Sequence, residues 1–168
     1  LRQQIEMAKV PSLYDLARSD FHAGKRVAIF VNFRETQNLL RDKIKQFSPF
    51  ISEIHGDQTA EERQKAIDLF QSNVHPVLIA TISSGGVGIS LHDENGNYPR
   101  SSIICPSFSA VDLRQALGRI HRANSKSKSV QRIVLASDTI EDSICSRLRI
   151  KLQSLDTIND TDLSPFNN

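Results

Sequence analysis

The feature of this 168-residue sequence that most constrains its fold is a series of five short, mainly apolar runs, each followed by a polar turn. Continuous apolar runs of strand length are typical of strands buried on both faces of a parallel sheet. The stretches between them carry apolar residues at helical spacing. The sequence therefore predicts an α/β fold, a doubly wound parallel sheet with helices on both faces. The expected strands cover residues 27–31, 51–54, 77–80, 102–105 and 131–136.

The expected domain organisation has three parts. Residues 1–24 predict a helical lead-in, in which Pro11 separates two helices and Gly24 ends the second. Residues 25–155 form one domain, long enough to bury a core. Residues 156–168 turn polar and are expected to be a tail or linker.

Composition limits the function classes. The chain is 39% hydrophobic and 24% charged, and it has no apolar run long enough to span a bilayer, so no membrane partner is expected. Cys105 and Cys145 lack the spacing of metal ligands, which predicts no metal site, reduced thiols and an intracellular setting, with nucleus or cytoplasm left open. The net charge of +2 does not by itself predict nucleic-acid binding, which needs local clusters of charge. Because the sequence does not begin with methionine, we expect a piece of a longer protein.

The stretch Gln115 to Arg122 reads Gln-Ala-Leu-Gly-Arg-Ile-His-Arg. On a helix, Gln115, Arg119 and Arg122 would share one face. Two guanidiniums near Gly118, where backbone can come close, suit an anion whose charge is spread over several oxygens, such as a phosphoryl group. The alternative interpretation is a solvated helix face.

Polar residues also follow the first two predicted strands. Asn32 and Arg34 lie where the first strand ends and a helix begins, a place where free backbone N–H groups and the helix dipole favour phosphate. His55 and Gly56 follow the second strand, and Arg63 lies on the next helix, which Thr59 and Glu62 should open as a capping box. The alternatives are a turn-forming asparagine, a solvated arginine and a structural histidine.

A glycine-rich loop follows the third strand, between Thr81 and Leu91. Its backbone can approach a ligand closely, and the hydroxyls of Thr81, Ser83 and Ser84 can donate to phosphate oxygens. The alternative is a tight packing turn between a strand and a helix.

Taken together, these stretches resemble motifs of superfamily 2 helicases and translocases. Residues 115–122 meet every defined position of motif VI, Gln-x-x-Gly-Arg-x-x-Arg. Residues 55–63 resemble the motif between IV and V, although Ala60 stands where many members carry glutamine. Residues 81–91 resemble motif V, and their Gly-Gly-x-Gly core is similar to that of Swi/Snf-type DNA translocases, with one additional residue before Gly88 and with Ser90 where RNA helicases usually carry aspartate. The resemblance covers residues 25–150 and implies the second, C-terminal RecA-like lobe.

The resemblance implies roles for named residues. Arg122 would be the arginine finger that reaches the γ-phosphate of ATP, and Arg119 would bind that phosphate or sense its loss. The residues that would meet ATP and relay closure are Gln115, Gly86 and Gly88. Those that would bind nucleic acid are Asn32, Arg34, His55, Gly56, Arg63, Thr81, Ser83 and Ser84.

The resemblance also implies a missing partner. The chain has no Walker A lysine and no Asp-Glu pair after a strand, so ATP and Mg²⁺ would be bound mainly by the N-terminal RecA-like lobe of the same protein. We therefore expect an ATPase or helicase as part of a larger protein, and no hydrolysis by this chain alone. Two alternatives stay open: a Swi/Snf-type translocase that moves on duplex DNA without strand separation, and a non-catalytic α/β module that binds nucleic acid. DNA is favoured over RNA, and the compact style of motifs V and VI also suggests a viral DNA helicase.

Overall fold

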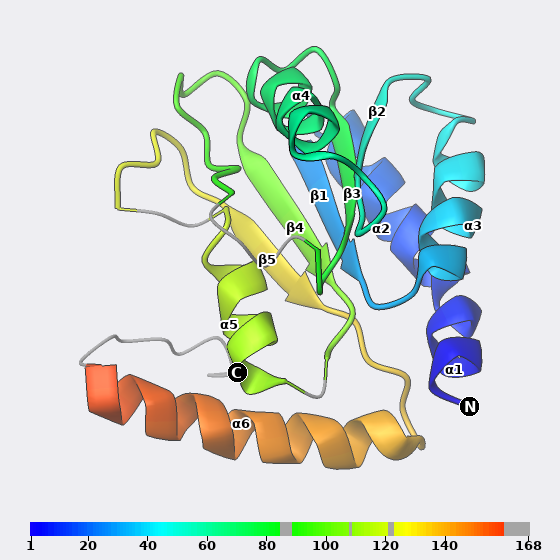
Figure 1. Ribbon diagram of the computed structural model, residues 1–168, viewed down its shortest axis with the longest axis vertical. Coiled ribbons are helices and arrows are strands. Elements are labelled where there is room, and N and C mark those ends of the chain that lie inside the picture. The colour runs from blue at the N-terminus through cyan, green and yellow to red at the C-terminus, as the bar shows by residue number, and fades with distance from the viewer. Residues whose placement is uncertain (85–88, 108, 121–122, 160–168) are drawn as a thin grey trace.

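The computed structural model of the protein describes residues 1–159 except for 85–88, 108 and 121–122. Its five strands form one sheet in which every neighbouring pair is parallel, in the order β2-β3-β1-β4-β5. The sheet in Figure 1 thus confirms the doubly wound parallel arrangement expected from the apolar runs. The strands are β1 (Arg26–Val31), β2 (Ile51–Ile54), β3 (Val77–Thr81), β4 (Arg100–Ile104) and β5 (Val130–Ile133).

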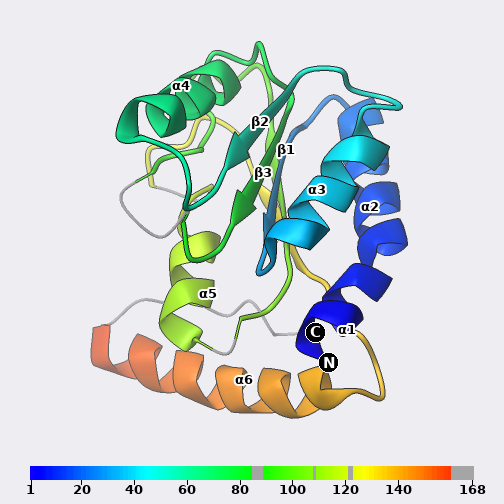
Figure 2. The same cartoon turned by 45° about the vertical axis from the view of Figure 1, so that its right-hand side comes forward.

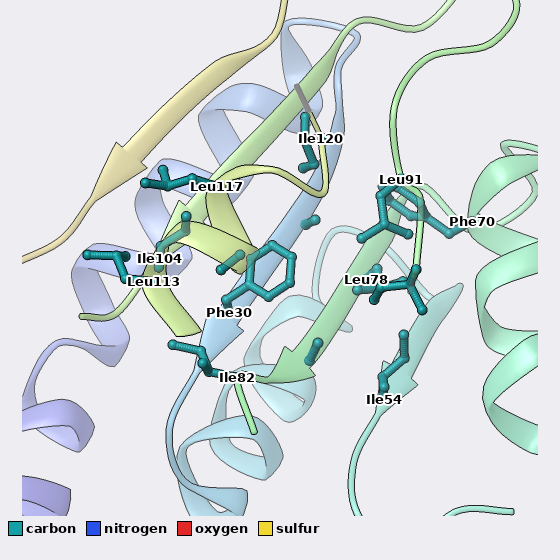
Figure 3. Packing of buried hydrophobic residues seen from close by; sticks show 14 of the residues in the cluster. Phe30, Ile54, Phe70, Leu78, Ile82, Leu91, Ile104, Leu113, Leu117 and Ile120 are labelled. Carbon is teal, nitrogen blue, oxygen red and sulfur yellow. The ribbon is translucent and has the colours of Figure 1, made fainter. Parts of the chain in front are cut away.

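Helices cover both faces of the sheet (Figure 2). On one face, α2 and α3 bury a cluster that includes Val27, Ile29 and Val31 of β1. On the other face, α4, α5 and α6 contribute to a cluster with Ala28 and Phe30 of the same strand, part of which Figure 3 shows. This alternation follows from the two-residue period of a strand. The helices are α1 (Arg2–Ala8), α2 (Val10–His22), α3 (Arg34–Ile44), α4 (Ala60–Gln71), α5 (Ala110–Leu117) and α6 (Ile140–Asn159).

The strand order places a switch point beside β1. The chain first winds from β1 to β2 and β3 on one side, then crosses to β4 and β5 on the other side. In open α/β sheets, ligands bind outside the carboxyl ends of the strands at such a point. A ligand site is therefore expected at the edge formed by the residues that follow β1, β2 and β3.

Several local expectations hold. Pro11 lies in the first turn of α2, and Gly24 has φ +80°, a conformation that favours glycine, after the end of that helix. Thr59 and Glu62 form the capping box of α4. The strand expected over 131–136 ends at Ile133 instead. The Val134 N–H still donates to the Ile104 carbonyl of β4, but the Val134 carbonyl accepts from Lys9, and the Ala136 N–H donates to Glu141.

The domain boundaries stay predictions. The lead-in is helical as expected, while α6 continues to Asn159, four residues past the expected boundary at 155. Among the described residues, no helix has both the length and the apolar character needed to cross a membrane.

Candidate functional site

The carboxyl edge of the sheet brings together the loops that follow β2 and β3. A Cβ placed on Gly56 would lie 3.5 Å from the Ser84 hydroxyl oxygen, so the two loops are in contact. The Thr81 hydroxyl donates to the Ser84 hydroxyl oxygen over 2.8 Å, and Ser83 is exposed beside them. Ser83, Ser84 and the exposed Gly56 thus share one small surface, which suits backbone phosphates, while Thr81 is buried at 5% exposure and holds Ser84 from below.

Asn32 follows β1, but its surroundings correct one expectation. The Asn32 and Phe33 backbone N–H groups were predicted to be free for phosphate; they donate instead to the buried Glu6 carboxylate of α1, over 3.0 and 3.1 Å. The Asn32 side-chain amide also donates to Glu6, over 2.6 Å, and to the Pro106 carbonyl over 3.1 Å. A carboxylate of the same chain therefore takes the anion position at the start of α3.

Arg34 stands at the first turn of α3 with its side chain 35% exposed. Its guanidinium donates to the Gln37 side chain over 2.7 Å and lies 3.6 Å from the Glu53 carboxylate of β2. Arg41 approaches the same carboxylate at 3.6 Å. Arg34 is thus placed at the edge as the sequence predicted, but with an acid beside it that no local pattern indicated.

His55 lies at the end of β2. Burial and the nearby Arg34 charge lower its pKa below the ordinary 6.5, so the ring is neutral at pH 7. Gln58 shapes the turn here: it accepts from the His55 N–H and donates to the Glu53 carbonyl. A neutral histidine offers hydrogen bonds to a ligand and no positive charge.

Arg63 lies on α4, where it lines an open groove of about 490 Å³. Ile89 and Ser90, at the end of the glycine-rich segment, also line this groove. The structure thus joins Arg63 to the motif V-like segment, and the groove offers polar side chains from α4, namely Gln64, Asp68 and Gln71.

Gln115 and Arg119 do not form the expected polar row. The helix α5 ends at Leu117, with Gly118 as its C-cap, so Arg119 lies beyond the helix. Gln115 is exposed, whereas Arg119 is 7% exposed and its guanidinium donates to the Ile89 carbonyl over 3.2 Å. The row fails because the Arg119 side chain turns into the core to bond Ile89. The predicted residues Arg122, Gly86 and Gly88 lie outside the described residues.

The end of α5 is remote from the carboxyl edge. Helix α5 starts after β4 at that edge and runs back along the sheet, and its Leu117 carbonyl accepts from Gln131 in the first part of β5. The structure therefore separates two regions: a polar edge that suits nucleic acid, and the end of α5, which carries the arginine motif. Within the described part of the chain, no group of three or more His, Cys, Asp or Glu side chains could hold a metal ion.

The comparisons with known proteins agree with this architecture. Residues 8–124 match the family model of the helicase conserved C-terminal domain. The chain is 41% identical over 97% of its length to the putative ATP-dependent RNA helicase L364 of Acanthamoeba polyphaga mimivirus, and it spans 30% of that protein. It is 35% identical over 80% of its length to a mouse SWI/SNF-related, matrix-associated, actin-dependent regulator of chromatin (subfamily A member 1), and it spans 13% of that protein.

The fold is shared with solved structures of the same class. The C-terminal part of the Fun30 ATPase domain superposes with a TM-score of 0.71 at 25% identity, covering 82% of this chain and 44% of that one. The chain belongs to the helicase C-terminal domain family, and it is the second, RecA-like lobe of a superfamily 2 helicase or translocase.

Proposed function

We propose that this chain is the C-terminal motor lobe of an ATP-dependent nucleic-acid helicase and that Arg122 is its arginine finger. The proposal is supported by the sequence Gln115 to Arg122, which meets every defined position of motif VI, and by the bond from the Arg119 guanidinium to the Ile89 carbonyl. That bond joins motif VI to Ile89, which lies within the motif V-like stretch of residues 81–91. A lobe that couples nucleic acid to ATP needs such a connection.

The roles at the nucleotide follow from charge and burial. Arg122 stabilises the charge that develops on the γ-phosphate, an effect typically worth about 10³ to 10⁵ in rate. Arg119 is buried against Ile89, which favours a role in positioning and sensing. Gln115, Gly86 and Gly88 relay closure of the cleft. ATP and Mg²⁺ are held mainly by the first lobe, which lies elsewhere in the longer protein.

The nucleic-acid track runs along the carboxyl edge. Phosphates are bound by side chains and backbone of the loops after β2 and β3 and by the first turns of α3 and α4, giving affinity with little sequence preference. Asn32 supports this track by fixing the turn after β1, since its amide is bonded to Glu6 and Pro106. The contacting residues are Arg34, His55, Gly56, Arg63, Thr81, Ser83 and Ser84.

The relatives carry names from both substrate classes, an RNA helicase and a chromatin regulator, and so they do not favour DNA over RNA. A duplex translocase is the second candidate, favoured by the Gly85-Gly86-Val87-Gly88 core. It would hydrolyse ATP on duplex DNA without displacing a strand.

The test is Arg122→Ala in the full-length protein. We expect ATP hydrolysis to fall by about 10³-fold or more, while the Kd for nucleic acid stays within about twofold because phosphate contacts lie elsewhere. Hydrolysis is measured at fixed salt with single-stranded DNA, duplex DNA and RNA, together with strand displacement. Arg18→Ala, which alters an exposed arginine on α2, is the control. Normal turnover in Arg122→Ala would refute the finger assignment, and no wild-type hydrolysis with any nucleic acid would favour the non-catalytic module.

A further inference from the structure

The segment from Ile89 to Asp93, called the strut below, is buried except at Ser90. Leu91 and Asp93 are fully buried, and Ile89 and His92 are 6% and 5% exposed. Leu91 packs in the same core cluster as Phe70 and Ile120 (Figure 3). The His92 carbonyl accepts from Gln71 at the end of α4 over 3.2 Å. A segment without regular secondary structure is thus fixed on several sides.

This strut holds the chain on both sides of Arg122. Before Arg122, the Arg119 guanidinium donates to the Ile89 carbonyl over 3.2 Å, and the Leu91 N–H donates to the Arg119 carbonyl over 2.9 Å. After Arg122, the Lys126 N–H donates to the Asp93 carbonyl over 2.8 Å, and the Ser127 hydroxyl donates to the Asp93 carboxylate over 2.6 Å. In the sequence, Arg122 lies between these two attachments.

Both oxygens of the Asp93 carboxylate accept hydrogen bonds. The oxygen that does not accept from Ser127 accepts from the Asn95 and Gly96 N–H groups over 3.1 and 3.0 Å, which shapes the loop after it. Gly96 has φ +81°, and a Cβ added there would lie 3.5 Å from the Lys126 Cβ, so this loop also rests on the segment after Arg122. Burial alone would raise the pKa of Asp93, but the Ser127 hydroxyl, the Gly96 and Asn95 N–H groups and the Arg100 charge hold it below its usual value, so the group is ionised at pH 7.

We propose that Asp93 is a positioning residue for ATP hydrolysis. Its bonds to Lys126 and Ser127 fasten the segment after Arg122 to the strut and so limit the positions that Arg122 can take. This inference rests on the proposed function. It adds to that function a residue outside the helicase-like motifs.

The experiment uses the full-length protein and removes one attachment without emptying the core. Ser127→Ala deletes the hydroxyl that Asp93 accepts from, and Ser127 is only half-buried, so the fold should be kept. We expect kcat for nucleic-acid-stimulated hydrolysis to fall by about tenfold, with KM for ATP and Kd for nucleic acid within about twofold. Ser127→Thr keeps the hydroxyl and should restore kcat. Asn97→Ala, at the exposed tip of the Asp93 loop, is the control.

Asp93→Asn provides the second variant. It removes the charge while keeping the shape, and it should lower kcat in the same way. Wild-type kcat in both Ser127→Ala and Asp93→Asn, in a protein where Arg122→Ala abolishes hydrolysis, overturns the positioning role and leaves the proposed function intact. A loss of nucleic-acid affinity or of folded protein that parallels the loss of kcat also overturns it, because the role is then structural. If Arg122→Ala itself keeps normal turnover, the proposed function is the part that fails.

Discussion

At the scale of single residues, Glu53 lies beside two arginines at the proposed nucleic-acid edge. Its carboxylate lies 3.6 Å from both Arg34 and Arg41, so it neutralises part of the charge that would otherwise face phosphate. We predict that Glu53→Gln tightens nucleic-acid binding by about two- to fivefold at low salt, with a steeper loss of affinity as salt rises. Fluorescence anisotropy over a salt series measures both quantities.

The control for this prediction is the same substitution in an Arg34→Ala background. There the gain should largely disappear, because the arginine that Glu53 restrains is gone. An unchanged or weaker affinity in Glu53→Gln alone would mean that the carboxylate helps to hold Arg34 in its binding position.

Residue roles of this kind could not be predicted from the sequence. The arginine and hydroxyl residues at strand ends were found because strand ends are visible as apolar runs followed by polar turns. Glu6, Glu53 and Asp93 act through partners that the fold brings close, at separations such as 26 residues for Glu6 and Asn32, and no local pattern indicates such a pairing. Because the sequence does not reveal the pairing of Glu6 with Asn32, the backbone N–H of Asn32 was expected to be free for phosphate.

At the scale of elements, helix α1 is fastened to the carboxyl edge by one buried acid. We predict that Glu6→Ala lowers the free energy of unfolding by about 3 kcal/mol, because the N–H groups of Asn32 and Phe33 and the Asn32 amide would lose their acceptor. Glu6→Gln should cost less, since one side-chain oxygen can still accept. Urea unfolding measures the change, and Glu35→Ala, an exposed acid in the first turn of α3, should cost well under 1 kcal/mol. A loss in Glu6→Ala no larger than in Glu35→Ala would show that solvent replaces the carboxylate.

The elements themselves were predicted better than their ends. Apolar period and capping residues are local, and the two lead-in helices, the α4 capping box and all five strands came from them. The end of β5 and the direction of the Arg119 side chain depend on tertiary bonds: the Val134 carbonyl and the Ala136 N–H bind Lys9 and Glu141, and the Arg119 guanidinium turns inward to bond Ile89. The polar row expected through Arg119 failed for this reason.

At the scale of the whole molecule, the residues to which we assign a function are separate from those that we expect to serve stability alone. The first group lies at the carboxyl edge, on α4, at the end of α5 and in the strut. The amino edge holds a buried ionic cluster in which the Asp20 carboxylate accepts from Lys25, Ser101 and Arg132, joining α2 to β4 and β5. We infer that this cluster serves stability alone, so it provides a test of the division.

We predict that Asp20→Asn lowers the free energy of unfolding by about 2 kcal/mol, less than for a fully buried pair because Lys25 and Arg132 are 23% and 34% exposed and can hydrate. Burial alone would raise the pKa of Asp20, but its bonds to Ser101, Lys25 and Arg132 lower it below 3.8 overall. Its stabilising effect is therefore present above pH 3.8 and should fade as the pH falls through the lowered value. Urea unfolding over a pH series measures this, with the exposed Asp15→Asn as control.

The same variant tests whether the Asp20 cluster serves stability alone. In full-length Asp20→Asn at pH 7.5, kcat and the Kd for nucleic acid should stay within about twofold of wild type. A tenfold loss of kcat while the protein is still folded would show that the amino edge contributes to ATP hydrolysis.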